Sequence, residues 1–395
     1  MKRASVFSPL HVTSRSASFG TRLVDARARG AVVTSRANVR WLSGFTGSNG
    51  TLIVGSEIGS PMVLVTDGRY AEQAARETES ARADVVVVAR RSQAEVRTAV
   101  ATHMASMAGP QATWALEADD ISLARYEALV AACESAGVQL SRERVIDAAP
   151  LLGDMRRVKS PAEIERITRA ARIADDALAE VAPALAAGTT EVQIRDALEG
   201  AMRRHGAEDV SFATIVATGD NAALPHHHPT QRRIAAGEAV VVDFGALVEG
   251  YHSDMTRTFV VDGPGAGEML ERHAVVRAAC EAGVGVVAPG VVASEVDVAC
   301  RRVLAAAGLE DELTHGVGHG VGLLIHEAPW VNARSNDVLR AGDVVTVEPG
   351  AYRVGLGGAR VEELLLVTDS GHLVLSNSPK EPTCPPSPRT TSRTE

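Results

Sequence analysis

Several features that mark other classes of protein are missing from this sequence of 395 residues. Cysteine is scarce, and no two cysteines form a Cys-x-x-Cys pair, so neither a zinc knuckle nor a disulfide framework is indicated. The four are Cys133, Cys280, Cys300 and Cys384. An excess of positive charge is also missing: the formal net charge is −9, which argues against broad binding to nucleic acid or to anionic membranes.

Long apolar segments are absent as well. The first 23 residues contain basic side chains but no apolar core of signal-peptide length, and no later segment approaches the length of a membrane span. With 45% hydrophobic and 23% charged residues, the composition is that of an ordinary soluble globular protein. We therefore expect a cytoplasmic protein that has neither nucleic acid nor membrane as a partner.

The length of the chain favours two domains, because one hydrophobic core seldom serves so many residues. Residues 1–22 are rich in Ser, Arg and Thr, which predicts a loose arm, and the proline-rich end predicts a disordered tail. Between them, short apolar runs first alternate with helical patterns such as residues 92–107 and 122–136, as is typical of an α/β domain. We predict domains over residues 1–152 and 153–382 and a tail over residues 383–395.

The second domain opens with a strong helix signal. Ser160, Pro161 and Glu163 supply the N-cap, a proline at the first helical position and the reciprocal glutamate of a capping box. Further helices are predicted over residues 190–205, 268–287 and 294–307. Strand-like runs lie at residues 212–218, 344–347, 364–367 and 373–375. The second domain is therefore predicted to be α+β, with a largely antiparallel sheet.

Two aspartates lie within the segment 240–258. Apolar, β-branched runs on either side of Gly245 and Gly250 predict two facing strands, which would bring Asp243 and Asp254 together. Two close carboxylates resist ionising together unless a cation lies between them, so the pair suggests a metal site. Taken alone, the pattern fits two turn-closing aspartates equally well, and further ligands downstream must decide.

Histidines supply one such ligand. His315 and His319 lie among four glycines in residues 314–322, a composition that lets the backbone approach closely and can hold an imidazole against a metal. His326 follows, next to Glu327 and a Pro-Trp turn. For any one of these histidines, the alternative interpretation is a solvated loop residue. That interpretation becomes weaker as the number of histidines in this segment grows.

Glutamates complete the candidate set. Glu348 follows the strand 344–347, and Arg360 and Glu362 should share one face of another strand, where the arginine helps to keep the carboxylate ionised. The candidate metal ligands are Asp243, Asp254, His319, Glu348 and Glu362. Oxygen donors with one imidazole suit Mn²⁺, Fe²⁺ or Co²⁺. Five such ligands can hold two ions about 3.5 to 4 Å apart, as in two-metal hydrolases.

Together, these motifs resemble the creatinase/aminopeptidase family (M24), specifically its Xaa-Pro aminopeptidase and prolidase branch. The resemblance rests on Asp243 and residues 253–258, 314–322, 326–329, 348–350 and 360–362. It covers residues 156–382, and residues 38–48 and 66–70 more loosely resemble the N-terminal domain of the same branch. It implies a pita-bread catalytic domain behind a smaller α/β creatinase-like domain, and hydrolysis of the bond between an N-terminal residue and a following proline.

The resemblance also implies how the ligands divide. Asp243 would chelate one ion, Asp254 and Glu362 would bridge both, and His319 and Glu348 would hold the other. A hydroxide bridging the two ions would attack the scissile carbonyl, because bound cations lower the pKa of water toward neutrality. Glu348 would accept and relay its proton.

Further catalytic residues are carried over from the resemblance in the same way. His226, His315 and His326 would position the substrate and stabilise the tetrahedral intermediate, and Arg360 matches an orienting arginine. His226 begins a run of three histidines that ends at His228, and the preceding Ala-Leu-Pro favours His226 as the member that faces the site.

The leading hypothesis is a cytoplasmic, homodimeric Xaa-Pro aminopeptidase acting on peptides with proline at the second position. Its cofactor would be two divalent ions, first of all Mn²⁺, with Co²⁺, Fe²⁺ and Zn²⁺ as alternatives. A prolidase restricted to dipeptides is the nearest rival, and the motifs separate the two poorly. A methionine aminopeptidase is disfavoured by the preceding domain, while a creatine-hydrolysing relative and a metal-free binding protein are disfavoured by the intact ligand set.

Overall fold

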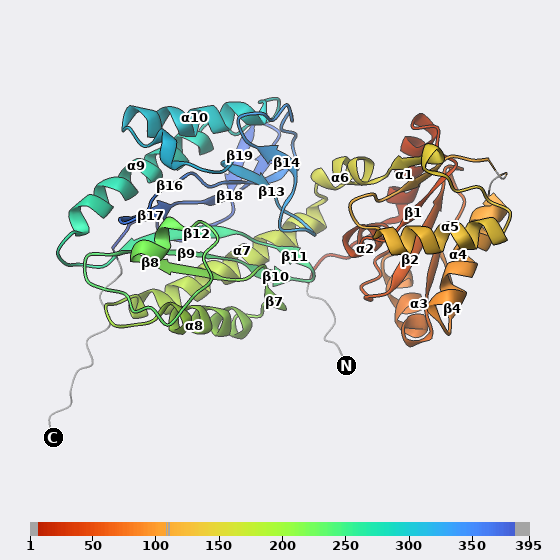
Figure 1. The fold of residues 1–395 in the computed structure, drawn as a ribbon, viewed down its shortest axis with the longest axis horizontal. Coiled ribbons are helices and arrows are strands. Elements are labelled where there is room, and N and C mark those ends of the chain that lie inside the picture. The colour runs from red at the N-terminus through yellow and green to blue at the C-terminus, as the bar shows by residue number, and fades with distance from the viewer. Residues whose placement is uncertain (1–6, 108, 110, 384–395) are drawn as a thin grey trace, which may run out of the picture. The chain divides into compact units, whose positions relative to one another are not determined.

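The computed structural model describes residues 7–107, 109 and 111–383 of the chain (Figure 1). These residues fall into two units, Met1–Arg156 and Arg157–Glu395, each with its own apolar core. The tail predicted over residues 383–395 lies outside the described residues except for Thr383. Within the described ranges, no helix combines the length and the apolar character that crossing a bilayer would require.

The first unit is a six-stranded mixed sheet with helices, in the strand order β4-β3-β2-β1-β5-β6. The strands are β1 (Gly30–Val33), β2 (Gly50–Gly55), β3 (Met62–Asp67), β4 (Val85–Arg90), β5 (Trp114–Leu116) and β6 (Val145–Asp147). The helices are α1 (Thr13–Asp25), α2 (Arg36–Ser43), α3 (Ala71–Ser80), α4 (Gln93–Met107), α5 (Leu123–Ser135) and α6 (Ala149–Arg157). The α/β alternation predicted from the sequence is confirmed, with α4 and α5 within one residue of their predicted bounds.

The loose arm predicted for residues 1–22 is wrong for much of its length, because α1 begins at Thr13. Phe19 and Leu23 on this helix are fully buried. Two large apolar side chains among many Ser and Arg residues are enough to anchor a helix to a sheet, although they leave the segment polar on average. Residues 1–6 of the predicted arm lie outside the described part of the chain.

The second unit is α+β, and every strand pairing among its described residues is antiparallel, as predicted. Its sheets have the orders β12-β9-β8, β14-β13-β15-β18-β19, β11-β10-β7 and β16-β17. The first strands are β7 (Asp209–Val210), β8 (Ile215–Thr218), β9 (Ala239–Phe244), β10 (Ala246–Val248), β11 (Tyr251–His252) and β12 (Met255–Val260). The later ones are β13 (Gly318–Gly320), β14 (Glu327–Val331), β15 (Val344–Val347), β16 (Gly350–Arg353), β17 (Gly357–Arg360), β18 (Glu363–Thr368) and β19 (Gly371–Val374).

Four long helices accompany these sheets, namely α7 (Pro161–Val181), α8 (Glu191–Arg204), α9 (Ala266–Val284) and α10 (Ala293–Ala306). Local sequence sets where they begin. Glu163 accepts a hydrogen bond from the backbone N–H of Ser160 at 2.8 Å, and Thr190 and Gln193 form the reciprocal pair that starts α8. Helices α9 and α10 pack against each other and bury their apolar faces in a core that also contains Val345 and Val347 of β15.

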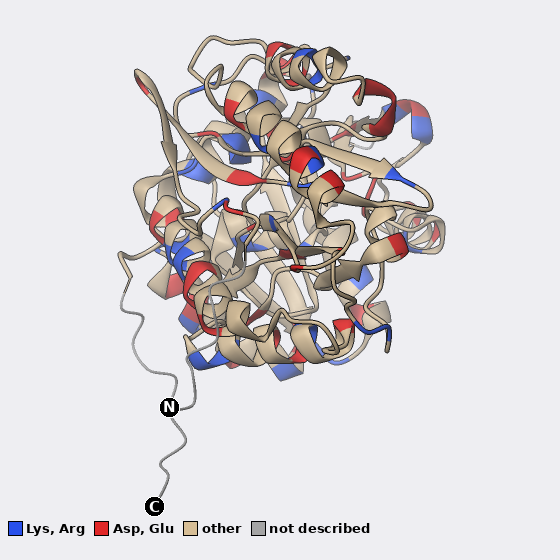
Figure 2. Cartoon of the chain, turned by 90° about the vertical axis from the view of Figure 1, so that its left-hand side faces the viewer, with Lys and Arg blue, Asp and Glu red and all other residues tan. Residues whose placement is uncertain are grey.

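Basic and acidic side chains are intermixed over the helices of the second unit (Figure 2). Its central strands β9, β12 and β15 are instead buried at every position. Charged residues that are buried on these strands therefore stand out, because such groups are rarely removed from water unless they are paired or bind an ion.

Strands β9 and β12 carry the two aspartates of the segment 240–258. They pair along their whole length with Asp243 opposite Thr256, and Asp254 directly precedes β12, so the predicted facing strands are confirmed. The connection between them is longer than a simple turn, because β10 and β11 leave this sheet and pair with each other. Gly245 lets the start of this connection pass close to Ser253 at its end. A Cβ atom at position 245 would lie 1.9 Å from the carbonyl oxygen of Ser253.

Candidate metal and catalytic site

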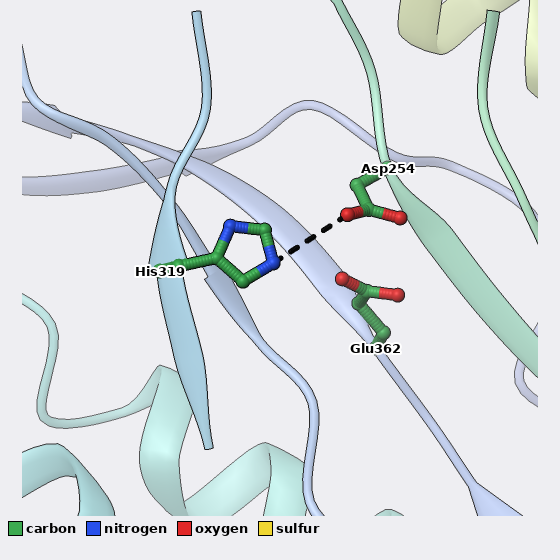
Figure 3. A group of neighbouring side chains, drawn as sticks. All are labelled: Asp254, His319 and Glu362. Atoms are coloured by element: carbon green, nitrogen blue, oxygen red, sulfur yellow. Dashed lines mark ion pairs between the residues drawn. The ribbon is translucent and has the colours of Figure 1, made fainter. Parts of the chain in front are cut away.

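Three of the predicted ligands converge on one point (Figure 3). Ligand atoms of Asp254, His319 and Glu362 all lie within 4.8 Å of one another. Asp254 precedes β12, His319 is the central residue of β13, and Glu362 lies between β17 and β18. All three residues are at most 6% exposed. Segments far apart in the sequence thus bring two carboxylates and one imidazole to the same buried place.

The other two predicted ligands adjoin this cluster. Glu348 follows β15, and its Oε1 lies 3.4 Å from His319 Nε2, while Asp254 Oδ2 lies 3.6 Å from the same nitrogen. Asp243 on β9 has its Oδ2 2.6 Å from a guanidinium nitrogen of Arg360. All five predicted ligands line one cavity of about 600 Å³.

The orientation of His319 favours a metal ion. Its Nδ1 lies 3.1 Å from the carbonyl oxygen of Gly320, so this nitrogen must carry the proton that is donated there. Burial lowers the pKa of His319 to about 4, and the ring is therefore neutral at pH 7. Its Nε2 then presents a lone pair toward the carboxylates of Asp254 and Glu348, which is unfavourable unless a cation lies between them.

The carboxylates lead to the same conclusion. Asp243 Oδ1, Asp254 Oδ1 and Glu362 Oε1 are buried without a hydrogen-bond partner. Burial and the neighbouring carboxylates raise the pKa of Asp254 and of Glu362 well above their ordinary values, and burial raises the pKa of Glu348 to about 8. Buried, unpartnered oxygens that repel one another fit a divalent cation as their missing partner. The residues present therefore fit a metal centre.

Metal-free protein should lose stability as the pH rises from about 4.5 to about 8. The folded-state pKa of Glu348 is about 8 against an ordinary value of 4.5, so the folded protein still holds a proton that the unfolded chain has released. Stability present at low pH is therefore lost as the pH rises through the folded-state value, and Asp254 and Glu362 act in the same direction. Differential scanning fluorimetry should show a falling Tm for metal-free protein and a nearly constant Tm with Mn²⁺.

Glu348→Gln provides the control for this titration, because it removes one of the raised carboxyl groups without a large change of shape. Its metal-free Tm should depend less on pH over the same range. A wild-type Tm that stayed constant or increased with pH in the absence of metal would contradict the assignment of these carboxylates to one repelling cluster.

A hydrogen-bond relay connects the arginine to the ligands. Arg360 Nε donates to Thr256 Oγ1 at 3.1 Å, and Thr256 donates in turn to Glu362 Oε2 at 2.8 Å. Another guanidinium nitrogen donates to the hydroxyl of Tyr352 at 2.7 Å, and that hydroxyl lies 3.0 Å from His315 Nε2. Because His315 Nδ1 faces the carbonyl oxygen of Gly316, Nε2 accepts from the tyrosine.

The sequence did not point to Thr256 or Tyr352. Thr256 lies two residues after Asp254 on a strand, so period-two alternation could have placed it on the same face. Tyr352 has no comparable local signal. The strand predicted to open at Arg360 is wrong, because Arg360 ends β17 and β18 begins at Glu363. Both Arg360 and Glu362 nevertheless line the cavity.

The predicted histidines also line this cavity. The ring of His326 meets that of His319 edge to face, with centroids 4.3 Å apart and an interplanar angle of 84°. In the histidine run, His227 Nε2 lies 2.9 Å from the fully buried carboxylate of Glu191 on α8, so this member is a structural anchor. His226 is exposed, and it adds to the effect of burial in lowering the pKa of His326. His227 and His228 line the cavity as well, so the choice of His226 stays a prediction.

Two family models match the sequence. Residues 165–369 match metallopeptidase family M24, and residues 15–158 match the creatinase/prolidase N-terminal domain. The fold and the buried Asp/His/Glu cluster thus define a metallopeptidase with two domains. The chain belongs to metallopeptidase family M24, and its architecture is the predicted pita-bread catalytic domain preceded by a creatinase-like domain.

Individual relatives are similar over most of the chain. The sequence is 34% identical to the uncharacterized peptidase YqhT of Bacillus subtilis, over 89% of this chain and 94% of the relative. An Xaa-Pro dipeptidase from Bacillus anthracis has a similar structure, with a TM-score of 0.85, 31% identity, and coverage of 93% of this chain and 99% of that chain. For an X-Pro aminopeptidase from Thermotoga maritima the TM-score is 0.80 and the identity 30%, with the same coverage. This chain is thus similar both to a protein named as an Xaa-Pro dipeptidase and to one named as an X-Pro aminopeptidase.

Proposed function

We propose that the protein is an Xaa-Pro aminopeptidase that holds two divalent metal ions. The observation that carries the proposal is the convergence of four carboxylates and one unprotonated imidazole nitrogen on a single cavity. Asp243 would hold one ion, His319 and Glu348 the other, and Asp254 and Glu362 both. When bound, these ions would lower the pKa of a coordinated water and polarise the scissile carbonyl.

The chain's own groups would move protons and orient the peptide. Glu348 is the most exposed of the ligand side chains, at 18%, so its carboxylate can take the proton of the attacking water and pass it to the proline nitrogen. His326 can donate to the carbonyl oxygen as negative charge develops there, and His315 and His226 line the same cavity around the substrate. Arg360, held by Asp243, would orient the ligands through Thr256.

The charge of the cavity supports cleavage of peptides longer than two residues. Among the described residues that line it, Arg360 is the sole lysine or arginine, and its guanidinium is already bonded to Asp243 and Tyr352. A dipeptide would place its terminal carboxylate in this cavity directly after the proline, without a free cation to pair with it. In a longer peptide that charge lies farther out, and Phe212 and Trp330 offer an apolar wall to the extra residue.

The kcat/KM of Mn²⁺-loaded protein should therefore be roughly 10- to 100-fold higher for a tripeptide Xaa-Pro-Xaa than for the matching dipeptide. A loss of this size is usual when one charged group is left unpaired. The amidated dipeptide Xaa-Pro-NH₂ is the matched control, because it has the length of the dipeptide without its terminal charge. It should be cleaved about as well as the tripeptide. Faster cleavage of the free dipeptide than of both others would establish the alternative, an Xaa-Pro dipeptidase.

That alternative is the activity for which several relatives are named. We further propose that Mn²⁺ is the resident metal, because oxygen donors with one imidazole suit it, and that the protein is cytoplasmic. A homodimer is proposed because the family resemblance implies it. A metal-free binding protein of the same fold is disfavoured, because it would have to tolerate the unpartnered oxygens of Asp243, Asp254 and Glu362.

A further inference from the structure

A buried ion pair lies beside the catalytic residues. Lys159 Nζ lies 2.9 Å from Glu327 Oε1, and the two side chains are only 1% and 3% exposed. Lysine is scarce in this chain, with three among 40 basic residues, Lys2, Lys159 and Lys380. Burying an ion pair contributes little to stability on average, because the loss of hydration offsets the attraction. The pair therefore calls for an explanation other than stability alone.

The pair joins two distant segments of the catalytic unit. Lys159 lies between α6 and α7, where its backbone N–H donates to the carbonyl oxygen of Gly342 at 2.9 Å. Glu327 directly follows His326 at the start of β14. Neither matched family region, residues 15–158 or 165–369, includes Lys159. Its contacts within this chain indicate its role.

These contacts centre on the turn between His319 and His326. A Cβ atom on Gly322 would lie 2.5 Å from Glu327 Oε1 and 3.1 Å from Lys159 Cε, so the pair packs directly against this glycine. The backbone N–H of Gly322 donates to the carbonyl oxygen of Leu324 at 3.0 Å, and that of Leu324 approaches Glu327 Oε2 at 3.4 Å. The ion pair therefore packs against Gly322 and binds Leu324, two residues within the turn.

The same turn connects to the strand that leads to Asp254. The backbone N–H of His252 on β11 donates to the carbonyl oxygen of Gly322 at 2.9 Å. His252 thus anchors Gly322, and a shift of the turn would be felt at His326, which ends it. Displacements of about 1 Å in such a site can reduce a rate by roughly 100-fold.

We propose that Lys159 is a positioning residue, which holds Glu327 in place and thereby fixes the turn so that the His326 imidazole faces the cavity. The proposal rests on the proposed function, since the step it serves is donation by His326 to the substrate. Glu327 is the anchored partner, and its carboxylate is committed to Lys159 instead of to a metal ion.

A double-mutant cycle with His326 tests the proposal. Lys159→Met should lower kcat for an Xaa-Pro-Xaa peptide roughly 10- to 100-fold, with KM and metal content nearly unchanged. In a His326→Ala background the same change should have almost no further effect, because the residue through which Lys159 acts is gone. Losses that multiply instead of overlapping, or an unchanged kcat for Lys159→Met, would overturn the proposal.

Lys380→Met is the control, because it breaks another lysine–glutamate ion pair of this unit, that of the partly exposed Lys380 with the buried Glu363 at 2.8 Å. Any loss of kcat that Lys380→Met causes should be equally large in the His326→Ala background. The double variant Lys159→Met/Glu327→Leu separates positioning from stability, because an apolar pair can replace a buried ion pair without loss of stability. It should fold with a near-normal Tm and still be slow. A normal kcat in this variant would show that the pair serves stability alone.

A readout independent of turnover completes the test. The imidazole ¹⁵N resonances of His326, assigned with the His326→Ala variant, should shift in Lys159→Met, whereas those of His103, which belongs to the first unit, should not. If wild-type protein cleaved no Xaa-Pro peptide, the proposed function would fail, while these resonances would still decide whether Lys159 positions His326. Unchanged His326 resonances would overturn the proposal whichever substrate the enzyme prefers.

Discussion

Asp254→Asn should remove nearly all peptidase activity, with a loss in kcat/KM of roughly 10³ or more, equivalent to about 4 kcal/mol of transition-state stabilisation. Asp254 lies at the centre of the site, where its Oδ2 is 3.6 Å from His319 Nε2 and its Oδ1 is buried without a partner. A neutral amide donates hydrogen bonds where a cation needs an anionic oxygen, so bound metal should fall as well. Steady-state kinetics and metal analysis on one preparation measure both quantities.

The same variant should be more stable than wild type when both are free of metal. Burial and the neighbouring carboxylates raise the pKa of Asp254, and removing its charge relieves that repulsion. Each kcal/mol gained would raise Tm by about 2 to 4 °C in a unit of this size. Asp262→Asn, on an exposed residue just after β12, is the control and should change neither activity nor Tm. An Asp254→Asn protein with two bound ions and near-normal turnover would refute the assignment.

His326→Ala should lower the rate of hydrolysis by about 10² to 10³ while leaving metal content intact, the usual effect of removing one donor aimed at a developing oxyanion. His326 lines the cavity with its ring 4.3 Å from that of His319, close enough to reach a substrate held by the ligands. Burial lowers its pKa, so it is neutral at pH 7 and can donate through one ring nitrogen.

Turnover and metal stoichiometry of this variant separate three roles. Loss of metal together with activity would make His326 a ligand, and no change in either would make it a solvated loop residue. Only a slow enzyme with its full metal content agrees with substrate positioning. His103→Ala, on α4 of the first unit, is a control that should leave both quantities unchanged.

Local signals in the sequence were sufficient for much of the catalytic unit. The capping residues around Ser160 locate the start of α7, because a cap involves only neighbouring residues. Apolar, β-branched runs around Asp243 and Asp254 predict their facing strands, because β9 and β12 are buried at every position along their length. The five candidate ligands were collected from the sequence motifs, the family resemblance implied how they divide between two ions, and all five line one cavity of the structure.

Contacts between distant segments could not be predicted in this way. Tyr352 joins Arg360 to His315, and Lys159 meets Glu327, through packing that no pattern of neighbouring residues encodes. The helix α1 was missed for a related reason. Its anchoring side chains, Phe19 and Leu23, are buried only because the helix packs against a sheet. The roles of such residues follow from tertiary structure alone.

The dispersal of the ligands over β9, β13 and the segment before β18 has a consequence for biosynthesis. About 120 residues separate Asp243 from Glu362, and a ribosome that adds 5 to 20 residues per second needs roughly 6 to 24 s to make them. During that interval Asp243 and Asp254 have been synthesised, but the remaining carboxylates that would repel them have not. Strands β8, β9 and β12 can therefore pair before Glu348 and Glu362 have been made, and the full set of ligands for a metal ion exists only once synthesis has passed Glu362.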